Sequence, residues 1–119
     1  MSQSVRFQEN LRKLALVDEG FVVDAAGLGI GLDEALVLDP KTAALLRLAV
    51  LVASGSSGVC LEWSTTRALA AGASEDEISD VLLAIAAVVG LGRVVAAAPD
   101  VALALGYDVA AALDDPPDE

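Results

Sequence analysis

The segment from Ser74 to Val89 carries the strongest folding signal in the chain. Ser74 followed three residues later by Glu77 is a capping box, in which each side chain binds the backbone N–H of the other residue at a helix N-terminus. Apolar residues then recur at helical spacing: Ile78, Val81, Leu82, Ile85 and Val89. Acidic and polar residues occupy the opposite side, so the segment predicts an amphipathic helix with one buried face.

The remaining apolar segments also carry helix signals, and none alternates convincingly as a strand does. Asp39-Pro40 predicts a helix start, because Asp is a preferred N-cap and Pro fits the first helical position. We expect helices over residues 4–16, 19–26, 40–54, 59–71, 75–89, 93–105 and 108–113. Pro99 is expected to bend or split the helix that contains it. The sequence therefore predicts an all-α fold.

The composition indicates one small domain that associates with copies of itself. Hydrophobic residues make up 55% of the 119 residues but aromatic residues only 3%, so Ala, Val and Leu supply most of the apolar surface. We expect a single domain over residues 1–113 and a disordered acidic tail over residues 114–119. So much apolar surface on so short a chain predicts a homo-oligomer, because large exposed apolar patches are unusual on soluble monomers.

Charge, histidine and cysteine counts exclude several classes of function. A net charge of −11 disfavours nucleic acids and anionic membrane surfaces, which attract clustered cations. The apolar stretch over residues 81–92 is shorter than the roughly 18 residues that span a bilayer, and no secretory signal is visible, so we expect a cytoplasmic protein. With no His and one Cys, the chain lacks an imidazole base and a dithiol pair. No metal site and no cofactor are predicted.

Two segments, LDPKTAALLRLAVLVASG and GVCLEWSTTRALAAGASEDEISDVLLAIAAVVG, resemble the carboxymuconolactone decarboxylase family, which includes the alkyl hydroperoxidase D-like proteins. The resemblance is strongest over residues 38–90. It implies an all-helical bundle whose subunits assemble as trimers or hexamers around a central helix hairpin. Redox members of the family carry Cys-x-x-Cys followed by His, and Ser57, Cys60 and Ser64 stand at these three positions. The glutamate of the redox members falls near Leu45, so the resemblance carries over the fold better than the catalytic groups.

Six residues around this segment are candidate site residues. Cys60 and Ser64 are the candidate catalytic residues, and the candidate ligand-binding residues are Arg47, Ser57, Trp63 and Arg67. Helical spacing places Cys60, Ser64 and Arg67 on one face of a helix, where the guanidinium group could anchor a carboxylate. Arg47 stands in a very apolar helix, where it requires a carboxylate partner or a wet cavity.

Structural roles are open for the same residues. Cys60 could be a small buried hydrophobe, since free cysteine is among the most buried residue types. Trp63 could serve core or interface packing instead of stacking on a ligand. Arg67 could form an ion pair at a subunit interface.

These observations lead to two functional hypotheses. The first is a non-redox protein that binds a small organic acid in the family pocket, with lyase or isomerase chemistry where it is enzymatic. The second is a catalytically degenerate relative that acts as an oligomeric or regulatory partner. Peroxidase activity, which the resemblance also suggests, is disfavoured because a single thiol has neither a resolving thiol nor a proton relay.

Overall fold

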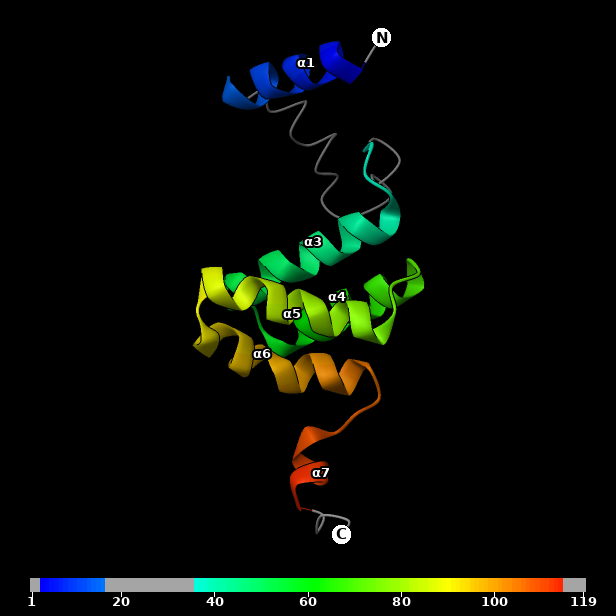
Figure 1. The fold of residues 1–119 in the computed structure, drawn as a ribbon, viewed down its shortest axis with the longest axis vertical. Helices are drawn as coiled ribbons and strands as arrows, with labels where there is room; N and C mark the ends of the chain where they lie inside the picture. Colours follow the sequence, from blue (N-terminus) through cyan, green and yellow to red (C-terminus); the bar gives the residue numbers. More distant parts are fainter. Residues whose placement is uncertain (1–2, 17–35, 115–119) are drawn as a thin grey trace. The chain divides into compact units, whose positions relative to one another are not determined.

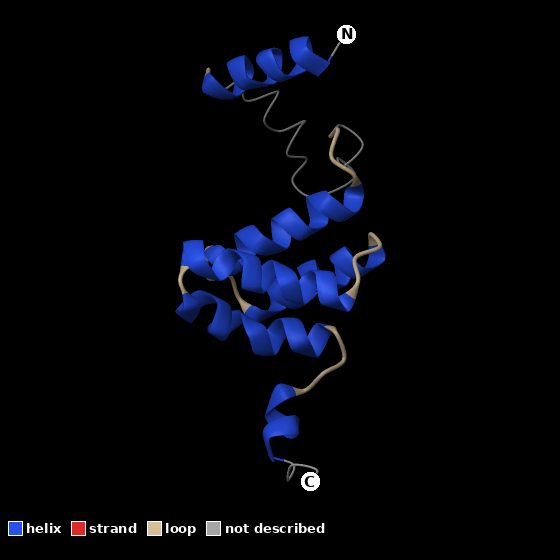
Figure 2. Ribbon diagram, in the orientation of Figure 1, coloured by secondary structure: helices blue, strands red, loops and turns tan. Residues whose placement is uncertain are grey.

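The computed structural model describes residues 3–16 and 36–114, and the chain divides into two compact units, residues 1–39 and 40–119. In the first unit the described helix is α1 (Gln3–Ala15). The second unit contains five helices, α3 (Pro40–Ala53), α4 (Gly58–Ala70), α5 (Glu75–Val89), α6 (Leu91–Ala104) and α7 (Val109–Asp114). Every regular element among the described residues is a helix (Figure 2), which confirms the predicted all-α fold.

Some predicted features fall outside the described ranges. The short helix expected over residues 19–26 and residues 115–119 of the expected tail both lie there. Residue 114 itself belongs to α7. A single domain over residues 1–113 stays a prediction. Within the described ranges, no helix combines the length and the apolar character that crossing a membrane requires.

Helices α3 to α6 pack together as a bundle in the second unit (Figure 1). Each contributes small or branched aliphatic side chains to one core, which includes Leu48, Val52, Leu61, Ala68, Ile78, Leu82, Ala97 and Val101. These side chains lack bulk, so the helices fill their core with many close contacts instead of a few large rings. Helix α3 contacts α4, α5 and α6, and each of these helices also contacts the other two.

The predicted capping box at the start of α5 is confirmed. The backbone N–H of Glu77 donates to Ser74 Oγ at 3.0 Å, and the backbone N–H of Ser74 donates to Glu77 Oε1 at 2.9 Å. The other oxygen of this carboxylate, Oε2, lies 2.9 Å from Lys41 Nζ in the first turn of α3. The Ser74 N–H, followed by Lys41, lowers the pKa of Glu77 from its usual value. One carboxylate therefore caps α5 and ties it to α3.

Helix α6 is continuous through Pro99, so the expectation that this residue splits the helix is wrong. Two opposite charges on α6, Arg93 and Asp100, lie beside the α3–α4 turn. A Cβ built on Gly58 would lie 2.8 to 3.0 Å from all three carboxyl atoms of Asp100, and one built on Gly55 would clash with the Arg93 guanidinium. Gly58 is the first residue of α4, and Gly55, at φ +71°, follows the last turn of α3.

This arrangement suits the electrostatics of the two helix ends. The N-terminus of α4 has no side-chain cap and no acid in its first turn, and α3 has no basic residue in its last turn. Helix dipoles favour a negative group at an N-terminus and a positive group at a C-terminus. Asp100 and Arg93, two turns apart on α6, supply these charges from a neighbouring helix. Helix α6 thus places one charge of each sign beside the turn of the α3–α4 hairpin.

Candidate functional site

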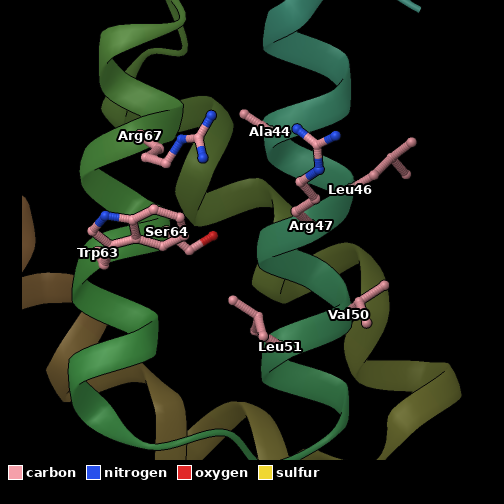
Figure 3. A pocket seen from close by; sticks show the side chains of 8 residues that line it. All are labelled: Ala44, Leu46, Arg47, Val50, Leu51, Trp63, Ser64 and Arg67. Atoms are coloured by element: carbon pink, nitrogen blue, oxygen red, sulfur yellow. The ribbon is translucent and has the colours of Figure 1, made fainter. Parts of the chain in front are cut away.

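A cavity of about 360 Å³ opens between α3 and α4, and it is lined by Ala44, Leu46, Arg47, Val50, Leu51, Trp63, Ser64 and Arg67. Figure 3 shows that one wall comes from each helix of the hairpin. Most of the lining is aliphatic or aromatic. The volume is within the range of small-molecule sites, which combine an apolar wall with a few polar groups.

Two arginines supply the positive charge of the cavity. Arg47 on α3 and Arg67 on α4 both line the cavity. In Figure 3 the Arg67 guanidinium extends from α4 toward α3, and the Arg47 side chain lies along α3. The guanidinium carbon of Arg67 lies 4.9 Å from the ring centroid of Trp63, one turn earlier on α4. This cation–π contact orients the Arg67 side chain, because the face of an indole ring attracts a cation.

Ser64 provides the neutral polar group of the cavity. It is only 4% exposed, and its hydroxyl points toward the space between α3 and α4 (Figure 3). Its neighbour Thr65 is also buried but donates its hydroxyl to the carbonyl of Leu61 at 2.7 Å, which fills a structural role within α4. Of the two buried hydroxyls, that of Ser64 is therefore the one placed to meet a ligand.

Trp63 is 58% exposed, so in the single chain it is not part of the core. Its ring forms part of the cavity wall and supports Arg67. The two other roles considered from sequence, contact with a ligand and packing at a subunit interface, both require such exposure.

Ser57 and Cys60 do not line this cavity. Ser57 is the N-cap residue of α4, is exposed and makes no side-chain cap hydrogen bond. Cys60 is a free and exposed thiol one turn before Ser64, so in the single chain it is not the buried hydrophobe considered from sequence. The structure brings together four of the six candidate residues, namely Arg47, Trp63, Ser64 and Arg67.

The aliphatic wall on α3 went unrecognised in the sequence. Leu46 and Val50 line the cavity and are 52% and 63% exposed, in a helix whose uniformly apolar sequence predicts burial on every side. The sequence did indicate this wall, because a lone charge in an apolar helix marks the side that faces a polar space. Leu46 and Val50 lie within one turn of that charge, Arg47.

The lining sets limits on the chemistry of the site. Two guanidinium groups and a hydroxyl can bind an anion through charge-assisted hydrogen bonds. The described lining contains no carboxylate, imidazole or thiol that would transfer a proton near neutral pH. Across residues 3–16 and 36–114, no three His, Cys, Asp or Glu residues gather in a way that would hold a metal ion.

The fold and the cavity together define an α-helical protein whose α3–α4 hairpin contains an apolar pocket with two arginines in its lining. The model of the carboxymuconolactone decarboxylase family matches residues 29–102, which is more than half of the chain, and the chain belongs to this family. The match contains the whole hairpin and the four candidate residues that line the cavity. Comparison with curated proteins and with solved structures gives no match.

Proposed function

We propose that the α3–α4 cavity binds a small organic acid, with its carboxylate held by Arg47 and Arg67. The observation that carries this proposal is the presence of both guanidinium groups in the lining of one otherwise apolar cavity. Guanidinium groups match the geometry of carboxylates, and such pairs are among the stronger hydrogen bonds of proteins. The aliphatic wall and the Trp63 ring would contact the hydrocarbon part of the ligand.

The distribution of charge supports an anionic ligand. The second unit, residues 40–119, has four cations, which are Lys41, Arg47, Arg67 and Arg93. Two of the four line this cavity, although the whole chain has a net charge of −11. A cationic pocket within an acidic protein attracts small anions locally, while the rest of the surface repels large polyanions.

Binding is the part of the hypothesis that the cavity supports best. A lyase or isomerase reaction on the bound acid would use the arginines to stabilise negative charge that develops on the substrate. Such a reaction also needs a proton donor or acceptor, and the described lining offers none. Binding without turnover requires only the groups that line the cavity.

A second candidate function is that of an oligomeric or regulatory partner without catalysis. The exposure of Leu46, Val50 and Trp63 at the cavity favours it, since a subunit interface would remove these side chains from water. A homotrimer or homohexamer built around the α3–α4 hairpin is the assembly that we propose. Light scattering on the purified chain gives its mass, and Val50→Asp is expected to shift that mass toward the monomer.

The binding proposal is testable through Trp63, which is the only tryptophan of the chain and lines the cavity. The probes are succinate and benzoate, each beside its uncharged amide, titrated against tryptophan fluorescence. We expect the acids to change the fluorescence saturably and the amides to bind at least 10-fold more weakly, because a hydrogen bond to a charged group contributes about 1.5–3 kcal/mol. Equal responses to acid and amide would contradict carboxylate recognition.

Arg93→Gln is the matched control for the arginines of the cavity. Arg93 lies on α6 against the turn of the hairpin and does not line the α3–α4 cavity. The Arg93→Gln substitution removes the same charge from the protein as Arg67→Gln does. We expect Arg67→Gln to weaken acid binding at least 10-fold and Arg93→Gln to leave it within about twofold, since distant charges are screened by salt. A similar loss in both variants would show that net charge, and not the cavity, attracts the acid.

A further inference from the structure

A second cavity, of about 510 Å³, lies where the turn of the α3–α4 hairpin meets α6, and we call it the α6 cavity. Its walls come from the last turn of α3, the α3–α4 turn, the first turn of α4, the α5–α6 turn and α6 itself. All of these elements belong to the unit of residues 40–119, so the cavity lies within one compact unit. It shares no lining residue with the α3–α4 cavity.

The charged groups in the lining of the α6 cavity are Arg93 and Asp100, one of each sign. Both stand on α6 at i and i+7, so they share a face of the helix, and their Cα atoms are about 10.5 Å apart along its axis. The Arg93 guanidinium lies against Gly55 and the Asp100 carboxylate against Gly58. The cavity therefore has a positive end and a negative end.

Both charged groups keep their capacity to bind a ligand. Among residues 3–16 and 36–114, neither Arg93 nor Asp100 forms an ion pair or a side-chain hydrogen bond, with the other or with any other residue. A guanidinium group has five N–H donors, and the two oxygens of a carboxylate accept about four hydrogen bonds. A molecule with one group of each sign can therefore satisfy both ends of the cavity.

The wall between the two charged groups is small and apolar. Ala96 and Ala97 both line the cavity, and each lies one turn from Arg93 and one turn from Asp100 on the same face of α6. Gly92 also lines the cavity, and a Cβ built on it would meet nothing within 4 Å. These short side chains leave room for a hydrocarbon chain that lies along α6 between the two charges.

We propose that the α6 cavity binds an ω-amino acid, a small zwitterion whose ammonium and carboxylate groups are separated by a hydrocarbon chain. Arg93 holds the carboxylate, Asp100 accepts hydrogen bonds from the ammonium group, and the methylene groups contact Ala96 and Ala97. This site is independent of the acid proposed for the α3–α4 cavity, because the two cavities share no residue and a simple acid lacks the ammonium group that Asp100 binds.

Isothermal titration calorimetry with 6-aminohexanoate tests the proposal, and three compounds of similar size are the controls. Hexanoate lacks the ammonium group, hexylamine lacks the carboxylate, and 2-aminohexanoate has the same atoms with its two charged groups close together. The titrations use the Arg47→Gln/Arg67→Gln chain, in which the α3–α4 cavity has lost its cations. We expect 6-aminohexanoate to bind saturably and each control compound to bind at least 10-fold more weakly, because each loses a charge-assisted contact.

Substitutions in the otherwise natural chain assign the binding to the α6 cavity. Asp100→Asn is expected to weaken binding of 6-aminohexanoate at least 10-fold. Asp76→Asn removes the same charge at an exposed position outside the lining and is expected to leave binding within about twofold. Ala96→Leu fills the space between the two charges and is expected to abolish binding, while Ala87→Leu, at an exposed position on α5 outside the lining, leaves binding unchanged.

Three outcomes would overturn the proposal. Equal binding of 6-aminohexanoate and 2-aminohexanoate would show that the site does not recognise the separation of the charges. Absence of 6-aminohexanoate binding would refute the site itself, and undiminished binding by Ala96→Leu would place the ligand elsewhere. Each of these outcomes leaves the binding of simple acids by Arg47 and Arg67 untouched, so the failure of one proposal is distinguishable from the failure of the other.

Discussion

Replacing Gly58 with alanine tests whether Asp100 holds the start of α4. The new Cβ would lie 2.8 to 3.0 Å from the three carboxyl atoms of Asp100, so the carboxylate has to move away. Its departure loses the interaction with the helix N-terminus, which contributes about 0.3–1 kcal/mol, and any overpacking of the site costs about 1–3 kcal/mol more. Against this loss, alanine favours a helix interior over glycine by about 0.5–1 kcal/mol, and by less at the first helical position, where Gly58 stands.

These magnitudes predict a sign change between two backgrounds. In the natural chain the losses exceed the gain, and Gly58→Ala is expected to lower the free energy of unfolding by about 1 kcal/mol. In the Asp100→Ala background only the helix-propensity gain is left, and Gly58→Ala is expected to raise the free energy of unfolding by about 0.5 kcal/mol or less. Urea denaturation followed by circular dichroism measures all four proteins of this double-mutant cycle.

Gly92 provides the matched control. It is the second residue of α6, and a Cβ built there would meet nothing within 4 Å. Gly92→Ala is therefore expected to stabilise the protein by a similar small amount in both backgrounds. If Gly58→Ala has the same effect with and without Asp100, the reasoning about the carboxylate at the start of α4 is refuted.

Three further predictions follow from the hairpin and the capping box. Ser64→Leu extends a side chain into the α3–α4 cavity and is expected to abolish binding of acids, while Thr66→Leu on the exposed side of α4 leaves binding unchanged. Tryptophan fluorescence titration measures both variants. Continued binding of acids by Ser64→Leu would place the ligand elsewhere. Ser74→Ala removes the N-cap of α5 and is expected to cost about 1 kcal/mol in urea denaturation. The Ser74 N–H and Lys41 lower the pKa of Glu77 from 4.5, so the ionised carboxylate stabilises the fold at neutral pH and this stabilisation is lost in acid. Glu77→Gln is therefore expected to flatten the fall in melting temperature between about pH 5 and pH 3. An unchanged slope in that window would contradict the role of the Glu77 charge.

Helix boundaries were predictable from sequence where local chemistry decides them. The capping box of Ser74 and Glu77 and the Asp39-Pro40 start depend on residues adjacent in the chain, and α5 and α3 begin at the expected positions. Helix α6 begins at Leu91 and not at the expected residue 93, because the turn at Gly90 is completed earlier and Gly92 is accommodated within the first turn. The family suggested by the quoted segments was confirmed by the match over residues 29–102.

The site was predictable only in part, because it depends on which helices face each other. Arg47 was marked by its isolation in an apolar helix, and it does line a cavity with Arg67, Trp63 and Ser64. Position in the family motif also pointed to Cys60, yet the thiol lies one turn from Ser64 at the exposed beginning of α4 and outside the cavity. The contacts of Asp100 and Arg93 with the hairpin turn depend on how α6 crosses it, which no local pattern indicates.

The central claim is that Arg47 and Arg67 make the α3–α4 cavity a site for a small organic acid. Isothermal titration calorimetry with succinate and benzoate, on the natural chain and on the Arg47→Gln/Arg67→Gln variant, tests it most directly. We predict saturable binding of at least one acid to the natural chain and a loss of roughly 100-fold or more in the double variant, since each charge-assisted contact contributes about 1.5–3 kcal/mol. Equal affinity in the two proteins, or no binding of either acid to the natural chain, would contradict the claim.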